Sequence, residues 1–219
     1  MPEAAAASPT AGRISGYAFS DLARTSVWDP LFEPGTYGNR GAGAGATIKP
    51  IRGLSAASVI ARNPSGSAGS RAPRQIGGLE TPDVGRLIAS DDLRVAADGP
   101  GRWRVTSHDR PEGALVRELR NALAGEASVT DQSHGWSMLE ISGPAVPDIL
   151  AKGSSIDFHM DVFGPGTAMP TSIHHMAVHL SCLDDRPGYA IQLFRSMAGS
   201  FATWLKDASA NFGYDVVQD

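Results

Sequence analysis

The chain has 219 residues, a length that suits one ordinary domain or a smaller domain with a long arm. Its net charge is −4 and no run of Lys or Arg stands out, which argues against a nucleic-acid partner, while the lack of about 18 consecutive apolar residues argues against a membrane span. Without a recognisable secretory signal, and with Cys182 as its single cysteine, we expect a cytoplasmic protein.

Residues 1–74 are rich in Gly, Ala, Ser and Pro and show no apolar period of 2 or 3.6. Such a composition buries too little apolar surface to offset the chain entropy lost on ordering, so we expect an extended or disordered N-terminal arm. Large apolar residues nevertheless interrupt it. Two interpretations stay open: a tail with incidental aromatics, or, favoured here, an arm that docks on a partner. The candidate anchors are Trp28, Phe32 and Tyr37.

Residues 75–219 carry the patterns of a folded domain. The segment 87–97 suits a strand or a short helix, and 102–106 alternates as a half-buried strand does. A helix is expected to begin near Pro111, with Asp109 as its cap, and to end at Gly125. Its inward face would carry Leu115, Leu119 and Leu123.

The middle of this domain holds the clearest strand, residues 136–142, after a short β-like piece at 129–130. A helix should follow between Gly143 and Gly153, because proline is tolerated in a first turn. The segment 173–183 is then expected to be one long strand. Its apolar positions alternate as Met176, Val178, Leu180 and Cys182.

The C-terminal end is expected to be a hairpin followed by a helix. Residues 184–188 make the turn and 189–195 return as the paired strand, after which Ser196 would cap the last helix and Gly213 would end it. Together these elements predict an α+β fold with ferredoxin-like βαββα elements, in which a mixed or antiparallel sheet carries helices on one face.

Histidines are the first residues to test for chemistry. His175 and His179 have the spacing of zinc ligands on a helix, but the glutamate of the His-Glu-x-x-His motif is absent. On a strand they would share one face about 13 Å apart, too far to hold one ion. We therefore predict surface or interface histidines and no metal site. The nearby members of the group are His159 and His174.

Three other patterns favour structural interpretations. The consecutive Ser107-His108-Asp109 has the residue types of a hydrolase triad, but consecutive residues do not usually converge in space as a triad must. The glycines at 41–45 lack the flanking strand and helix of a dinucleotide site, so they indicate a linker. Cys182 lies on an apolar strand face, as buried inert cysteines do. The sequence therefore predicts no catalytic, cofactor or metal site in this chain.

Four short segments carry a resemblance to a known superfamily. They read VTDQSH at 129–134, LEISGP at 139–144, DILAKG at 148–153 and SIDF at 155–158. This run resembles the strand–helix module of the aminomethyltransferase superfamily, which includes the glycine-cleavage T-protein. The downstream half resembles the gamma subunit of heterotetrameric sarcosine oxidase, as does RWRV at 102–105. Its matching residues are Arg195-Ser196, Phe201, Trp204-Leu205 and Phe212-Gly213.

The resemblance extends over about residues 87–213 and implies a function for the assembled complex. The family's enzyme oxidises sarcosine to glycine with formation of hydrogen peroxide, and its one-carbon product can pass to tetrahydrofolate. The resemblance places FAD, FMN and NAD in the large subunits and zinc in the delta subunit. It implies that a gamma subunit holds none of these, packs directly against the alpha subunit and supports assembly with it, in a complex that also contains beta and delta subunits.

One residue of this chain matches a catalytic position of the T-protein. The family's Asn-Asp pair falls on Ile156-Asp157, so the aspartate is present and the asparagine is not. Asp157 is therefore a weak folate-site candidate and is expected to act mainly in a turn. Two alternatives remain: the equivalent subunit of an N-methylglutamate dehydrogenase-type complex, or a stand-alone folate-binding one-carbon enzyme.

Overall fold

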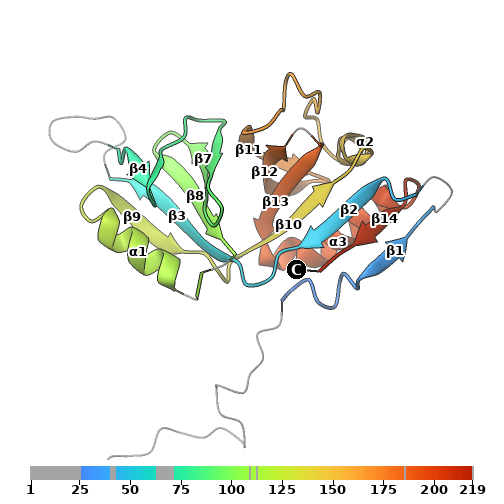
Figure 1. The fold of residues 1–219 in the computed structure, drawn as a ribbon, viewed down its shortest axis with the longest axis horizontal. Coiled ribbons are helices and arrows are strands. Elements are labelled where there is room, and N and C mark those ends of the chain that lie inside the picture. Colours follow the sequence, from blue (N-terminus) through green and yellow to red (C-terminus); the bar gives the residue numbers. More distant parts are fainter. Residues whose placement is uncertain are drawn as a thin grey trace, which may run out of the picture.

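The structure, a computed structural model, describes residues 26–39, 43–62, 72–108, 110–111, 113–184 and 186–218. Over these residues the chain forms two large sheets that stand beside each other like the arms of a V (Figure 1). The predicted α+β class is confirmed. The expected single sheet is instead two large sheets, with two helices on the outer face of the larger and one on the outer face of the smaller.

The larger sheet has seven strands in the order β1-β14-β2-β10-β13-β12-β11. Every pairing is antiparallel except β14 with β2, which is parallel, so this sheet is mixed. In that order the strands are Gly35–Tyr37, Tyr214–Val216, Ala46–Pro50, Trp136–Ser142, Gly188–Phe194, Met176–Asp184 and Ala168–Ile173.

A two-residue turn divides the strand that the sequence predicted over 173–183. His174 and His175 have φ values of 47° and 65°, and Ile173 pairs with Met176 across them. Positive φ at both central residues is the geometry that joins two antiparallel strands without splaying them. The single strand was therefore wrong: β11 ends at Ile173 and β12 begins at Met176. Pro170 fits within β11 because this strand lies at the sheet edge.

Two helices cover the outer face of the seven-stranded sheet. They are α2, Val146–Ala151, and α3, Ala198–Ser209, which follows a short 3₁₀ turn at Arg195–Met197. Ser196 lies inside that turn, and the residue before α3 is Met197, which makes no side-chain cap, so the predicted cap was wrong. The core between sheet and helices includes Ile48, Leu139, Ile141, Leu180, Tyr189, Ile191, Phe201 and Leu205.

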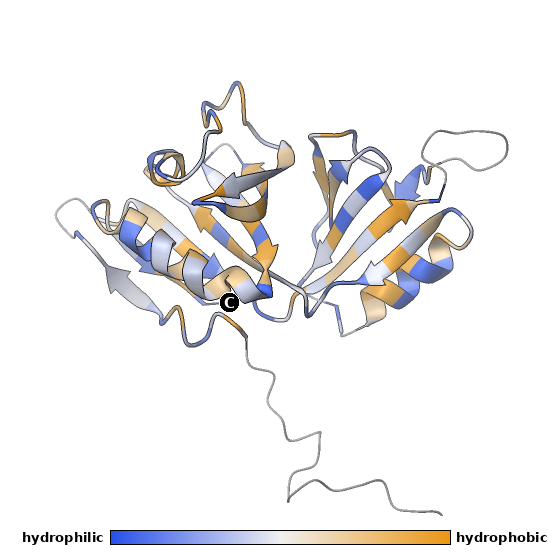
Figure 2. Ribbon diagram, turned by 180° about the vertical axis from the view of Figure 1, so that it is seen from behind, coloured by the Kyte–Doolittle hydropathy of each residue, from blue (hydrophilic) through white to orange (hydrophobic). Residues whose placement is uncertain are grey.

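The smaller sheet has five antiparallel strands in the order β6-β7-β8-β3-β9. Helix α1, Ala114–Ala122, covers its outer face, and Figure 2 shows both hydrophobic and hydrophilic residues along this helix. In order, the strands are Leu87–Ala89, Arg94–Gly99, Arg102–Ser107, Ser55–Ala61 and Ala127–Asp131. A two-stranded ribbon of Gln75–Ile76 and Leu79–Glu80, β4 and β5, lies beside it.

The inward face predicted for helix α1 is confirmed, while its start is shifted. Leu115, Leu119 and Leu123 are all buried against the sheet. The helix begins at Ala114 rather than near Pro111, because Gly113 adopts a left-handed conformation (φ 70°) immediately before it. Asp109, the predicted cap, lies outside the described residues.

The predicted boundary at residue 75 is wrong. Strands β1, β2 and β3 all precede it, and β2 and β3 are interior strands of the two sheets. Their composition hid them, because β3 reads SAASVIA and its small residues resemble a linker. Pairing with strands remote in the sequence stabilises such segments, which composition cannot reveal. Residues 1–25 of the expected arm lie outside the described part of the chain.

The chain crosses between the two sheets at the foot of the V. One crossing runs from β2 to β3 through residues 51–54, and the other from β9 to β10 through residues 132–135. These two segments are called the linkers below. Because both sheets turn their helices outward, the inner faces of β7 and β8 lie toward β10, β12 and β13.

Candidate functional site

The three predicted docking anchors belong to the chain's own core. Trp28 and Phe32 are 0% and 1% exposed, with ring centroids 5.8 Å apart. Tyr37 is half-buried and stacks on Tyr214 at 5.3 Å. The assignment of Trp28 and Phe32 as partner anchors is therefore wrong, because their apolar surface is already buried against the seven-stranded sheet and its helices.

Asp157 lies in the exposed loop that follows α2. Its Oδ1 accepts a hydrogen bond of 2.9 Å from the backbone N–H of His159, the geometry of an aspartate that stabilises a turn. Ile156, the residue in place of the family's asparagine, packs against the core of the seven-stranded sheet. A folate contact by Asp157 remains a prediction.

The four histidines that the sequence singled out lie in three segments: the turn between β11 and β12, strand β12, and the loop after α2. His174 and His175 form the turn between β11 and β12, so His175 and His179 do not share a strand face as predicted. His159 is exposed in the loop after α2. Within the described residues there is no group of three or more His, Cys, Asp or Glu side chains suited to a metal ion.

The remaining sequence patterns occupy structural positions. Ser107 ends β8 opposite Ser55, beside the half-buried His108. Of the glycine run at 41–45, the described part meets the C-terminal segment: the N–H of Gly45 donates to Phe212 O and Gly213 O. Cys182 is fully buried, and burial raises the pKa of its thiol to about 11.

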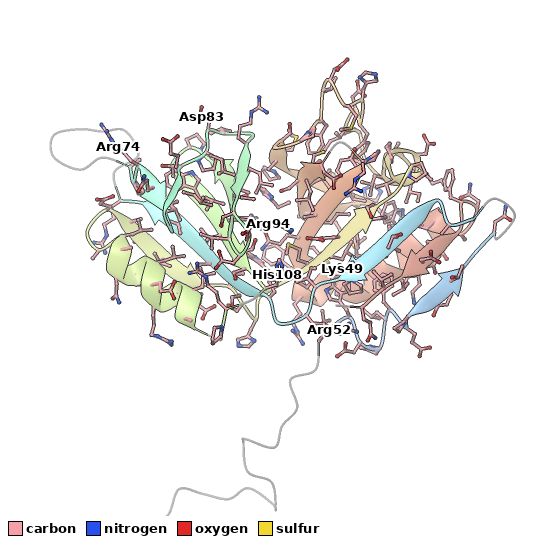
Figure 3. All side chains as sticks on the ribbon, in the orientation of Figure 1. Lys49, Arg52, Arg74, Asp83, Arg94 and His108 are labelled. Atoms are coloured by element: carbon pink, nitrogen blue, oxygen red, sulfur yellow. The ribbon has the colours of Figure 1, made fainter. Side chains whose placement is uncertain are left out.

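No sequence pattern predicted the polar junction that joins the inner faces of the two sheets. Arg94 on β7 lies 2.5 Å from Glu140 on β10 as an ion pair, and Figure 3 places Arg94 between the sheets. Arg104 on β8 pairs with Asp98 at 3.0 Å and lies 4.4 Å above the ring of Trp136. The contacts of Arg94 with Glu140 and of Arg104 with Trp136 link strands that are remote in the sequence, so no local pattern predicted them.

His179 is the buried histidine of this junction. Its Nε2 lies 3.3 Å from the carbonyl oxygen of Ala97 on β7, so the ring carries its proton there and donates it. Burial lowers the pKa of His179 to about 4, and the positive charge of Arg104 contributes in the same direction. Asp98 is 4.0 Å from the same nitrogen, but a neutral imidazole forms no ion pair with it.

The junction leaves room for one water molecule and no substrate. A cavity of about 20 Å³ lies among Arg104, His179 and Gln192, and that volume holds a single water. His179 has its ring proton committed to a backbone carbonyl and a pKa far below neutrality, which is unsuited to a general base near neutral pH. The arrangement fits a set of structural contacts that hold the two sheets together.

A second cavity, of about 230 Å³, opens at the foot of the V, and we call it the foot cleft. Both linkers line it, so neither sheet alone could form it. Arg52 pairs there with Asp29 at 2.7 Å, and this hydrogen bond lowers the pKa of Asp29. Figure 3 shows Arg52 at the foot of the V. Other lining residues are Leu54, Ser133, His134, Trp136 and Arg195.

Two exposed apolar side chains lie at and just after the end of β13, on either side in sequence of Arg195. Phe194, the last residue of β13, is 52% exposed and pairs with Trp136 across the strands. Met197 is 37% exposed in the 3₁₀ turn, and Arg195 between them lines the cleft. The sequence predicted Met197 on the apolar stripe of the last helix, whereas the structure places it in the 3₁₀ turn before α3, partly exposed.

No helix in the described part of the chain is long and apolar enough to cross a membrane.

Comparison with known proteins identifies one family. Residues 62–211 match the sarcosine oxidase, gamma subunit family. A relative from Arthrobacter sp., named sarcosine oxidase subunit gamma, is 32% identical over 184 residues, which cover 81% of this chain and 87% of the relative.

Two solved structures resemble the fold. Heterotetrameric sarcosine oxidase from Corynebacterium sp. U-96, in complex with pyrrole 2-carboxylate, contains a chain that is 27% identical with a TM-score of 0.68, covering 76% of this chain and 85% of that one. The glycine cleavage system aminomethyltransferase T from Bartonella henselae is 16% identical with a TM-score of 0.55, covering 80% of this chain but only 48% of that one. The latter likeness concerns the fold alone, and the chain spans about half of that protein.

Proposed function

Because the chain belongs to the sarcosine oxidase gamma subunit family, we propose that it serves as the non-catalytic subunit that supports assembly of a heterotetrameric sarcosine oxidase. The observation that carries this proposal is the likeness to a chain of the solved heterotetramer, which extends over most of both chains. In this proposal the subunit packs against the alpha subunit, and the beta and delta subunits complete the complex.

The chemistry of the junction supports a non-catalytic role. Its buried histidine is held neutral and hydrogen-bonded to a backbone carbonyl, and its cavity is of water size. We place FAD, FMN, NAD and zinc in the partner subunits, where the oxidation of sarcosine and the transfer of the one-carbon unit to tetrahydrofolate take place. The single cysteine, Cys182, supports a cytoplasmic location, where thiols stay reduced.

The direct test is to co-express this chain with the other three subunits and to purify the complex through a tag on this chain. We expect the four chains to co-purify with bound flavin and to produce hydrogen peroxide from sarcosine. The chain purified alone should show neither flavin absorption nor turnover. Flavin bound at unit stoichiometry to the isolated chain, or activity without partners, would overturn the non-catalytic role.

A comparison of two substrates distinguishes this proposal from the alternative, an N-methylglutamate dehydrogenase-type complex. The purified complex is offered sarcosine and N-methylglutamate at equal concentration. Preference for sarcosine supports an oxidase of the kind that the relatives are named for, while preference for N-methylglutamate would move the chain to a dehydrogenase of the N-methylglutamate type.

A further inference from the structure

Gln192 places an amide group in the middle of the polar junction. It lies on β13, paired with Met138 of β10 on one side and with His179 of β12 on the other, and it is 5% exposed. Its Oε1 accepts a hydrogen bond of 3.4 Å from Nη1 of Arg104, which fixes the orientation of the amide. Its Nε2 is buried and has no hydrogen-bond partner within the described part of the chain. A buried amide N–H is costly unless an acceptor lies beside it, so this group points to a ligand.

The cavity of about 20 Å³ in the junction is bounded by both sheets. Gln192 and Ser181 line it from β13 and β12 of the larger sheet, and Arg104 and Thr106 line it from β8 of the smaller sheet. A buried water site needs a volume of about one water-sized sphere and two to four polar partners. This cavity meets both requirements, and its volume excludes a larger ligand.

The polar groups that line the cavity define how a water molecule would be held. The water oxygen can accept the N–H of Gln192 that has no other acceptor. The guanidinium groups of Arg94 and Arg104 only donate, so they offer nothing to the hydrogens of the water. The hydroxyl groups of Thr106 and Ser181, residues that are each 6% exposed, can accept those hydrogens.

We propose that the polar junction binds one water molecule, which accepts a hydrogen bond from Nε2 of Gln192 and donates to the hydroxyl oxygens of Thr106 and Ser181. Because Gln192 and Thr106 belong to different sheets, this water bridges the two halves of the molecule. A bridging water binds nearly as favourably as a direct hydrogen bond, so it contributes to holding the sheets together. The inference concerns the chain's own fold and does not depend on the proposed function.

A high-resolution crystal structure of the full chain, alone or within its complex, tests the site. We expect a density peak of one water molecule at about 3 Å from Nε2 of Gln192. Gln192→Met keeps the length of the side chain without its amide, and the peak should be lost from that variant. A wild-type structure without the peak would overturn the proposal. So would a halide at the same place, identified by its anomalous signal after exchange of chloride for bromide.

A double-mutant cycle tests the bridge between the sheets. The amide of Gln192 bonds to Arg104 and not to Thr106 within the described residues, so coupling between positions 192 and 106 requires a shared partner. Gln192→Met and Thr106→Val are made singly and together, and the unfolding equilibrium constant of each variant is measured. The double variant should differ by about fivefold from the product of the two single effects.

The matched control replaces Thr106→Val by Ser55→Ala. Ser55 is a buried residue of the neighbouring strand β3, its hydroxyl donates to the carbonyl oxygen of Arg110, and it lines no part of the cavity. Its effect should simply multiply with that of Gln192→Met. If the effects of Thr106→Val and Gln192→Met also multiply, the bridge is rejected. The wild-type crystal structure decides the proposal where a variant fails to fold.

Discussion

The outer and inner faces of the two sheets are built on different principles. The outer faces bury apolar side chains beneath helices, as at Leu139 and Val59, both 0% exposed. The inner faces meet through charged and polar contacts such as Arg94 with Glu140. Apolar burial favours compactness in any arrangement of similar shape, whereas paired charges are satisfied only in one register. The outer cores therefore stabilise each half, and the junction fixes how the halves meet.

The largest effect is expected in the outer core. Phe32→Ala should lower the free energy of unfolding by about 3–5 kcal/mol, because it removes a buried ring and leaves a cavity. Thermal and denaturant unfolding of the purified chain measure it. The matched control, Phe194→Ala, removes the same atoms from a half-exposed position and should cost much less. Equal effects would mean that residue 32 is not part of the core.

The second-largest loss of stability is expected when His179, in the polar junction, is protonated. The folded pKa of His179, about 4, lies below its ordinary value of 6.5, so the unfolded chain binds this proton more tightly. The stability due to this group is complete above about pH 6.5 and falls as the pH drops toward 4, by about 3 kcal/mol in total. His179→Gln, whose amide can donate to Ala97 O, should flatten this part of the profile.

The control for that profile is His159→Gln, which changes an exposed histidine in the loop after α2. Its unfolding free energy should follow the wild-type curve between pH 4 and pH 7. If the unfolding free energy of His179→Gln falls with pH as steeply as that of the wild type, protonation of the buried ring does not cause the loss of stability in this pH range.

A smaller effect is expected for the ion pair of the junction. Arg94→Met should destabilise the chain by about 1–2 kcal/mol, because Glu140 loses its partner while its side chain is only 21% exposed. The double variant Arg94→Met with Glu140→Leu should recover most of that loss. Arg52→Met, at a more exposed pair with Asp29, serves as the control and should cost less than about 1 kcal/mol. A double variant no better than Arg94→Met would contradict this account.

The smallest effect is expected at Asp157, which belongs to neither face. Asp157→Ala removes the acceptor for the N–H of His159 and should cost about 0.5–1 kcal/mol, whereas Asp157→Asn keeps an acceptor and should cost less. Titration of the isolated chain with tetrahydrofolate tests the other role. Binding that is lost in Asp157→Asn but not through unfolding would establish Asp157 as a folate contact.

Local patterns predicted the elements whose stabilising contacts are close in the sequence. The apolar run at 136–142 gave β10 with its observed bounds, and the period of Leu115, Leu119 and Leu123 gave the buried face of α1. The turn at His174-His175 was missed, because it has none of the Asn or Gly residues that usually mark such geometry. The polar junction was missed because its ion pair joins residues that are remote in the sequence: Arg94 and Glu140 are 46 residues apart.

The sequence by itself determined the fold class, the resemblance to a family, and most of the strand and helix faces in the last two thirds of the chain. These depend on side-chain periodicity and on short motifs, which act within a few residues. Only the tertiary structure decided that Trp28 and Phe32 are core residues, that residues 46–50 and 55–61 are interior strands, and that two linkers enclose a cleft. Burial and strand pairing there depend on partners remote in the chain, which composition does not encode.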